Sequence, residues 1–98
     1  MYTFIREVTF KSMADSVRGM PVAAALCKYY KDAHMVDMVM LHAVSGSPNR
    51  IRFVAQFASL DAWMVASEQA MKDESFQQLL AEIAPTVDAS KTYDEFWK

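Results

Sequence analysis

Along RIRFVAQF, residues 50–57, the hydrophobic residues Ile51, Phe53, Ala55 and Phe57 alternate with a second set that is polar except for Val54. This period of two is typical of a β-strand with one buried face. A second apolar stretch, HMVDMVMLHAV at residues 34–44, precedes it, and SGSPN at residues 45–49 supplies turn residues between the two. The pattern predicts a β-hairpin, and the rest of the chain can be placed around it.

The stretch at residues 34–44 is apolar on both sides, and a strand of that kind needs cover on both faces. His42 and Asp37 interrupt opposite sides of it. A four-residue loop at residues 46–49 would pair His42 with Phe53 and direct it toward the pocket face. A five-residue loop would turn every side chain of this strand to the other face. We expect the four-residue loop, and the face of His42 stays open at this point.

The N-terminal segment at residues 2–10 also alternates as a strand, with Arg6 in the middle of its more apolar face. Residues 12–32 have helical periodicity. Gly19 and Pro21 interrupt that pattern, and proline removes a helical hydrogen bond. We expect a kink at this point, or a short helix followed by a second one that begins at Pro21.

The C-terminal half predicts two helices and a strand. Ser59 can cap a helix over residues 59–71, Asp73 can cap another, and residues 90–97 suggest a final strand. The order βαββαβ predicts an α+β fold of the ferredoxin-like kind. It is a four-stranded antiparallel sheet with helices on one face and the first strand beside the third. We expect residues 1–98 to form a single domain.

Composition narrows the functional classes. The 98 residues have a net charge of -2 and scattered basic residues, which argues against nucleic acid as a partner. Cys27 is the single cysteine and suits a reducing compartment. The charges of Arg6 and Glu7 come too early for a signal peptide, and no apolar run approaches the roughly 20 residues that span a membrane. We expect a cytoplasmic protein with no membrane partner.

Arg6 and His42 are the candidate catalytic residues. Arg6 could form a structural ion pair with Asp37, Glu82 or a carboxylate near the C-terminus. It could equally anchor a carboxylate or oxyanion, because the guanidinium presents a planar fork of donors. His42 could be a hydrogen-bonded histidine of the core or the sheet edge, or a general base with a suitable pKa range.

Aromatic side chains offer a second group of candidates. Tyr29, Tyr30 and Trp63 could line a pocket and donate hydrogen bonds, or could serve in ordinary packing. Two histidines and one cysteine give no metal-ligand spacing. We therefore expect no metal, no haem and no other cofactor.

Three groups of residues carry a resemblance to known proteins. They are Phe4, Arg6 and Val8 in the first strand, FASLDAW at residues 57–63 and KDESFQQLL at residues 72–80. These segments resemble the NIPSNAP-like and antibiotic-biosynthesis-monooxygenase-like proteins of the dimeric α/β barrel group. The resemblance implies that two sheets pack face to face as a homodimer and that a small organic ligand lies between sheet and helices.

The resemblance also implies roles for particular residues. Arg6 and Phe57 resemble strand positions that face the pocket, and Trp63 resembles an aromatic residue of the second helix. Lys11 and Ser12 stand where NIPSNAP-like proteins often have Pro-Gly. The second helix has no histidine, which argues against haem degradation. The predicted ligand-binding residues are Arg6, Tyr29, His42, Phe57 and Trp63.

Two functions of different classes follow. The first is a dimeric protein that binds a small organic ligand. The alternative is a cofactor-free monooxygenase or isomerase that acts on an aromatic or polyketide-like substrate. A cavity that holds Arg6 and His42 together would favour the enzyme. The homodimer is expected from the sheet itself, because the face without helices would expose Ile5 and Val54 together with apolar side chains of residues 38–41.

Overall fold

The computed structural model describes residues 1–98, and its elements follow the predicted order. Two short 3-10 helices, η1 and η2, lie between the last α-helix and the last strand. The elements are β1 (Tyr2–Thr9), α1 (Met13–His34), β2 (Val39–His42), β3 (Arg50–Phe57), α2 (Leu60–Met71), α3 (Glu74–Ile83), η1 (Ala84–Thr86), η2 (Ala89–Lys91) and β4 (Tyr93–Trp97). No helix is both long enough and apolar enough to cross a membrane.

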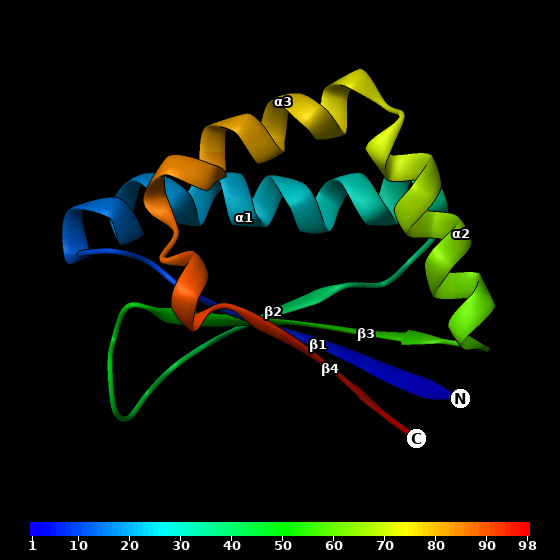
Figure 1. The fold of residues 1–98 in the computed structure, drawn as a ribbon, viewed down its shortest axis with the longest axis horizontal. Helices are drawn as coiled ribbons and strands as arrows, with labels where there is room; N and C mark the ends of the chain where they lie inside the picture. Colours follow the sequence, from blue (N-terminus) through cyan, green and yellow to red (C-terminus); the bar gives the residue numbers. More distant parts are fainter.

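The four strands form one sheet in the order β2-β3-β1-β4, and all neighbours are antiparallel. The predicted ferredoxin-like arrangement is confirmed, including β1 beside β3 at the centre. All three α-helices lie on one side of the sheet, and the other side is bare (Figure 1). We call these two sides the inner face and the outer face.

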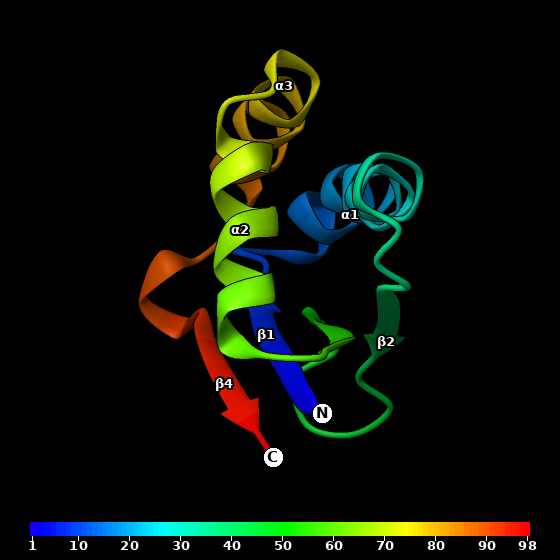
Figure 2. The same ribbon diagram turned by 90° about the vertical axis from the view of Figure 1, so that its right-hand side faces the viewer.

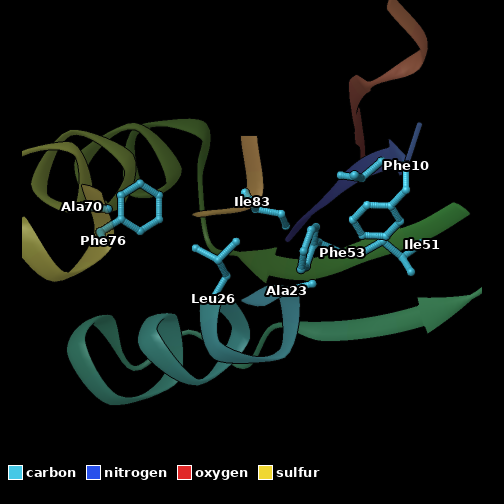
Figure 3. Close-up of a cluster of buried hydrophobic side chains, with 9 residues drawn as sticks. Phe10, Ala23, Leu26, Ile51, Phe53, Ala70, Phe76 and Ile83 are labelled. Atoms are coloured by element: carbon cyan, nitrogen blue, oxygen red, sulfur yellow. The ribbon is translucent and has the colours of Figure 1, made fainter. Parts of the chain in front are cut away.

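The inner face and the helices enclose the core. Alternate residues of β3 point inward and are buried, as the period of two predicts, and Phe4 and Val8 of β1 are buried beside them. Leu26 of α1 and Phe76 of α3 meet them from the helix side (Figure 3). The largest cluster of buried side chains comprises Val8, Phe10, Ala23, Leu26, Ile51, Phe53, Ala70, Phe76 and Ile83.

Helix α1 is one continuous helix, so the alternative of a second helix that begins at Pro21 is wrong. The carbonyl that Pro21 leaves without a donor belongs to Val17, an exposed residue, so water can satisfy it. Gly19 is buried for a different reason. A Cβ atom at this position would overlap the ring of Phe10 and would lie 2.9 Å from Oγ1 of Thr86. The glycine lets α1 pack closely against Phe10 and Thr86.

Strand β2 is much shorter than the predicted strand at residues 34–44. Met35 ends α1 in the left-handed conformation, and the backbone N–H of Val36 donates to the carbonyl of Tyr30. The residues that follow therefore cap the helix and lead to the sheet before regular pairing begins at Val39. The helix caps at Ser59 and Asp73 are as predicted, since each side chain accepts a backbone N–H of the first turn.

The hairpin register differs from the prediction by two residues. His42 pairs with Ile51, and Met40 takes the predicted place opposite Phe53. Because Ile51 and Phe53 share the inner face, His42 still lies on the side that the four-residue loop predicts. The connection is longer than expected and spans residues 43–49. Figure 2 shows β2 and β4 as the two edges of the sheet, with α2 covering one end.

The packing of Gly19 against Phe10 gives a stability prediction. Gly19→Ala should lower the free energy of unfolding by about 1–2 kcal/mol, because overpacking a core typically costs about 1–3 kcal/mol and the gain in helix propensity offsets less than that. Urea denaturation followed by circular dichroism measures the change. Val17→Ala, an exposed change on the same helix, should stay within about 0.5 kcal/mol of the wild type. A variant Gly19→Ala as stable as the wild type would contradict this account of the close approach.

Candidate functional site

A cavity of about 40 Å³ lies between the inner face and the helices. Aromatic side chains form most of its wall, and its polar groups are the guanidinium of Arg6, the hydroxyl of Tyr30 and the hydroxyl of Ser67. Its lining residues are Phe4, Arg6, Leu26, Tyr30, Met38, Phe53, Phe57, Trp63, Ser67, Phe76 and Leu80. The structure thus brings together three of the predicted site residues: Arg6, Phe57 and Trp63.

Arg6 forms a bidentate ion pair with Asp94, its direct neighbour across the β1–β4 ladder. Nε lies 2.6 Å from Oδ1, and Nη2 lies 2.8 Å from Oδ2. The guanidinium carbon also lies 5.4 Å from the centre of the Phe4 ring, within the range of a cation–π contact. The hydrogen bonds to Asp94 raise the pKa of Arg6 above its ordinary value, against the opposing effect of burial.

Asp94 is therefore the partner that the sequence suggested only as a carboxylate near the C-terminus. Asp37 and Glu82, the named alternatives, do not pair with Arg6. The alternation of YDEFW places Asp94 and Phe96 on one side of β4, so the sequence pattern could indicate which face of the strand Asp94 occupies. The register of β4 against β1 was needed to find it, and the sequence alone does not supply that register.

Trp63 stands at one end of the cavity as part of an aromatic cluster. Its ring centre lies 5.6 Å from that of Phe4 and 4.9 Å from that of Phe96. The Trp63 and Phe96 rings meet at 80°, the edge-to-face geometry that aromatic pairs favour. Helix α2 supplies Trp63 from its first turn, and the cap at Ser59 fixes where that turn begins.

Tyr29 does not line the cavity, although the sequence analysis chose it as a ligand-binding residue. Its hydroxyl donates to a carboxylate oxygen of Asp73 at 2.9 Å and lies 3.0 Å from Nε2 of His34. Burial and the neighbouring carboxylate raise the pKa of Tyr29 to about 12. Tyr29 thus joins α1 to the cap of α3, which is a structural role.

Tyr30, the next residue, takes the place that was predicted for Tyr29. It lines the cavity, and the structure gives its hydroxyl no hydrogen-bond partner. Burial raises the pKa of Tyr30, while the positive charge of Arg6 acts in the opposite direction. Helical periodicity could not decide which of the two adjacent tyrosines lines the cavity, because both lie near the boundary of the buried face.

His42 also lies outside the cavity, so the cavity does not hold Arg6 and His42 together, which is the arrangement that would favour an enzyme. It is exposed near the end of an edge strand, beside a separate surface hollow that Glu7, Arg50 and Arg52 also line. The shift of the hairpin register placed His42 opposite Ile51, two residues along β3 from Phe53, the partner of Arg6. A general base from His42 cannot act on a ligand held at Arg6 in this arrangement.

A second and wider hollow adjoins the cavity. This groove has a volume of about 610 Å³ and runs along β1, β4 and the end of α3. It shares Arg6, Leu26, Phe53 and Leu80 with the cavity. Asp94 lines only the groove. The pair between Arg6 and Asp94 therefore lies where the two spaces meet.

The chemistry available at this site is limited and specific. A guanidinium in apolar surroundings stabilises negative charge on a ligand, and a tyrosine hydroxyl beside it can donate or accept one hydrogen bond. Flat aromatic walls favour a flat or apolar ligand body. No three His, Cys, Asp or Glu side chains are grouped so that they could hold a metal ion.

The outer face carries a separate charged cluster around Glu7. This carboxylate is 5% exposed and accepts hydrogen bonds from Tyr93, from Nη1 of Arg50 at 3.2 Å and from Nε of Arg52 at 3.3 Å. The hydrogen bond from Tyr93 and the two arginines hold the pKa of Glu7 below its ordinary value, although burial opposes them. The cluster connects the central strands β1 and β3 with the edge strand β4.

The fold and the cavity define the chain as a ferredoxin-like α+β protein with a space between its sheet and its helices. No family model matches the sequence, and no curated protein matches it. Solved structures do match in fold. An uncharacterised NIPSNAP domain protein from Burkholderia xenovorans is 13% identical, with a TM-score of 0.81 over 100% of this chain and 93% of that chain.

Two oxygenase structures share the same fold. One is an antibiotic biosynthesis monooxygenase, 13% identical, with a TM-score of 0.76 over 100% of this chain and 97% of the other. The second is a variant of SnoaB, a cofactor-independent oxygenase from Streptomyces nogalater. It is 12% identical, with a TM-score of 0.72 over 99% of this chain and 90% of the other. Both groups that the sequence resembles are thus among the structural neighbours, and the likeness at these identities establishes the fold alone.

The burial of Glu7 gives a prediction of pH dependence. Because its pKa is lowered in the folded state, Glu7 stabilises the fold above the unfolded-state value of about 4.3, and this contribution is lost as the pH falls below it. Glu7→Gln should lower the free energy of unfolding at pH 7 by about 1–3 kcal/mol. Between about pH 5 and pH 3, the free energy of unfolding of this variant should decline less steeply than that of the wild type.

Urea denaturation at pH 7, 5 and 3.5 measures this effect. Glu82→Gln is the matched control, because Glu82 is exposed and forms no ion pair. It should keep the stability and the pH slope of the wild type. A Glu7→Gln variant that keeps the full decline toward low pH would show that other carboxylates cause it.

Proposed function

We propose that this chain is a homodimeric binding protein for a small organic ligand. The ligand lies between the inner face and the helices, where Arg6 contacts its polar group, and its apolar body extends from the groove toward Tyr30, Phe57 and Trp63 of the cavity wall. Tyr30 replaces Tyr29 in this proposal, and His42 is left out, because of where their side chains lie.

The proposal rests on one observation: Arg6 is a single positively charged residue in a cavity wall made mostly of aromatic side chains. Nine of the eleven residues around the cavity are hydrophobic, and Arg6 is the charged residue among them. Small-molecule sites commonly combine an apolar lining with a few placed polar groups. A protein that used this space only for packing would gain little from a guanidinium there, since removing a charge from water costs free energy.

The cavity alone, at about 40 Å³, has room for little more than a water molecule. The adjoining groove, at about 610 Å³, is within the size range of ligand sites. A ligand would therefore occupy the groove and extend toward the cavity. The shared residues Arg6, Leu26, Phe53 and Leu80 would contact it from both sides.

A groove-filling variant tests the binding site. Ala84→Phe should weaken the binding of the neutral probe N-phenyl-1-naphthylamine by at least about tenfold, because Ala84 lines the groove and a ring at this position would occupy part of it. Glu82→Phe is the matched control, since Glu82 is an exposed residue at the end of α3 that does not line the groove. It should bind the probe as the wild type does. Probe fluorescence measures binding, and thermal unfolding shows whether each variant is folded.

A wild-type protein that does not bind the probe would count against a ligand site. The same holds if Ala84→Phe and Glu82→Phe bind it equally well, because the probe would then occupy another surface.

The proposed dimer rests on the outer face. Val39 and Leu41 are each about half exposed, at 49% and 51%, and they stand opposite Val54 and Arg52. Ile5 pairs with Val54 on the next strand and extends this apolar area to the sheet centre. No helix covers it (Figure 1). Monomers seldom leave a contiguous apolar surface of this kind in water, and a twofold copy is the commonest cover.

The charges of this face are compatible with a second copy. Glu7 and Glu95 balance Arg50 and Arg52, so the four charges sum to zero. Glu7 already has its partners within the chain, which lowers the cost of covering it. Two such faces can approach each other without net repulsion.

A charge at the centre of the outer face tests the dimer. Val54→Glu should convert a dimer of twice 11.1 kDa into a species of 11.1 kDa, or cause aggregation, because a buried unpaired carboxylate is costly. Val17→Glu makes the same change at an exposed position of α1 and should leave the mass unchanged. Light scattering at micromolar concentration measures both. A wild-type mass of 11.1 kDa would contradict the proposed dimer.

A second candidate is a cofactor-free oxygenase. The fold of SnoaB, a cofactor-independent oxygenase, supports it, and so does the position of Tyr30 beside Arg6. In such a reaction the substrate itself gives electrons to dioxygen, and Arg6 would stabilise the phenolate or enolate that does so. Oxygen uptake with 1,4-dihydroxynaphthalene distinguishes the two functions. An oxygenase would exceed the rate of autoxidation, whereas a binding protein would not.

A further inference from the structure

The carboxylate of Asp94 occupies one edge of the Arg6 guanidinium. Two of the five guanidinium donors point at Asp94, from Nε and from Nη2, and this edge is one of the two that can bind a carboxylate in bidentate fashion. Asp94 itself is part of the groove wall. A ligand carboxylate in the groove would take the same position relative to Arg6.

The pair is placed so that it can open. The Arg6 side chain is 41% exposed and that of Asp94 is 33% exposed, and ion pairs with this access to solvent contribute little to stability. Asp94 lies on β4, an edge strand, so its side chain can turn toward water. Arg6 is held more firmly, because its guanidinium lies over Phe4 and its strand is central.

We propose that Asp94 is an internal competitor for the ligand. In the free protein Asp94 accepts the hydrogen bonds of the Arg6 guanidinium. The carboxylate of an apolar monocarboxylic acid displaces Asp94 from this position. The body of that acid lies in the groove against Leu26, Phe53 and Leu80. A neutral ligand cannot replace Asp94 at the fork, so the exchange selects for acids. This inference rests on the proposed ligand site and adds the chemical class of the ligand.

The charges of the groove support this class. Arg6 and Asp94 are the charged residues among the twelve that line it. When the side chain of Asp94 turns away, one positive charge remains in an otherwise apolar wall. A ligand with a single negative charge and an apolar body matches that wall in charge and in polarity.

Two probes of the same shape test the proposal. 2-Naphthoate carries a carboxylate, and 2-naphthamide is its neutral counterpart. Asp94→Asn removes the competing charge and should tighten the binding of 2-naphthoate by at least about tenfold, while the affinity for 2-naphthamide changes by less than about twofold. Asp94→Ala should act in the same way. Isothermal titration calorimetry measures the affinities, and thermal unfolding checks that each variant is folded.

Glu95→Gln is the matched control. It removes the same charge from the neighbouring residue of β4, whose side chain lies on the outer face. It should leave both affinities within about twofold of the wild type. Equal tightening by Glu95→Gln would mean a general effect of net charge and would overturn the proposal.

The remaining outcomes separate this proposal from the proposed function. If 2-naphthamide binds and Ala84→Phe abolishes its binding, but 2-naphthoate does not respond to Asp94→Asn, then the ligand site stands and the competitor role of Asp94 is wrong. If neither probe binds to the wild type or to any Asp94 variant, both proposals are overturned.

Discussion

The alternation of side chains along β1 is the constraint on which the rest of the molecule depends. This strand is central, so its even-numbered residues must face the helices and its odd-numbered residues must face the other way. A slip of one residue would exchange the two sets and expose the core. Arg6 belongs to the inward set. The fold therefore places a cation among apolar side chains, and the neighbouring strand must supply Asp94 to satisfy it.

The sequence predicted those features that depend on local chemistry. The period of two identified β1 and β3, and the capping side chains of Ser59 and Asp73 located the starts of α2 and α3. These signals need no knowledge of distant residues. For the same reason, the inward positions of Arg6 and Phe57 could be predicted, because alternation alone fixes the face.

Features that depend on tertiary packing could not be predicted in the same way. Gly19 weakens a helix by its intrinsic propensity, but here it admits the ring of Phe10, so the contact outweighs the local preference. The residues at 35–38 look like a strand, but they serve to cap α1 and cross to the sheet. The choice between Tyr29 and Tyr30, like the partner of Arg6, depends on geometry that no local pattern encodes.

The ladder between β1 and β4 joins the two ends of the chain, and this has a consequence for folding. Arg6 and Asp94 are 88 positions apart, so their contact closes a loop of nearly the whole chain. Loops of this length form late, and topologies rich in such contacts fold slowly. Until β4 docks, the edge of β1 is open to pairing with other chains. During synthesis on a ribosome, the helices and β3 would emerge before β4. The wall of the groove that carries Asp94 would therefore be completed last.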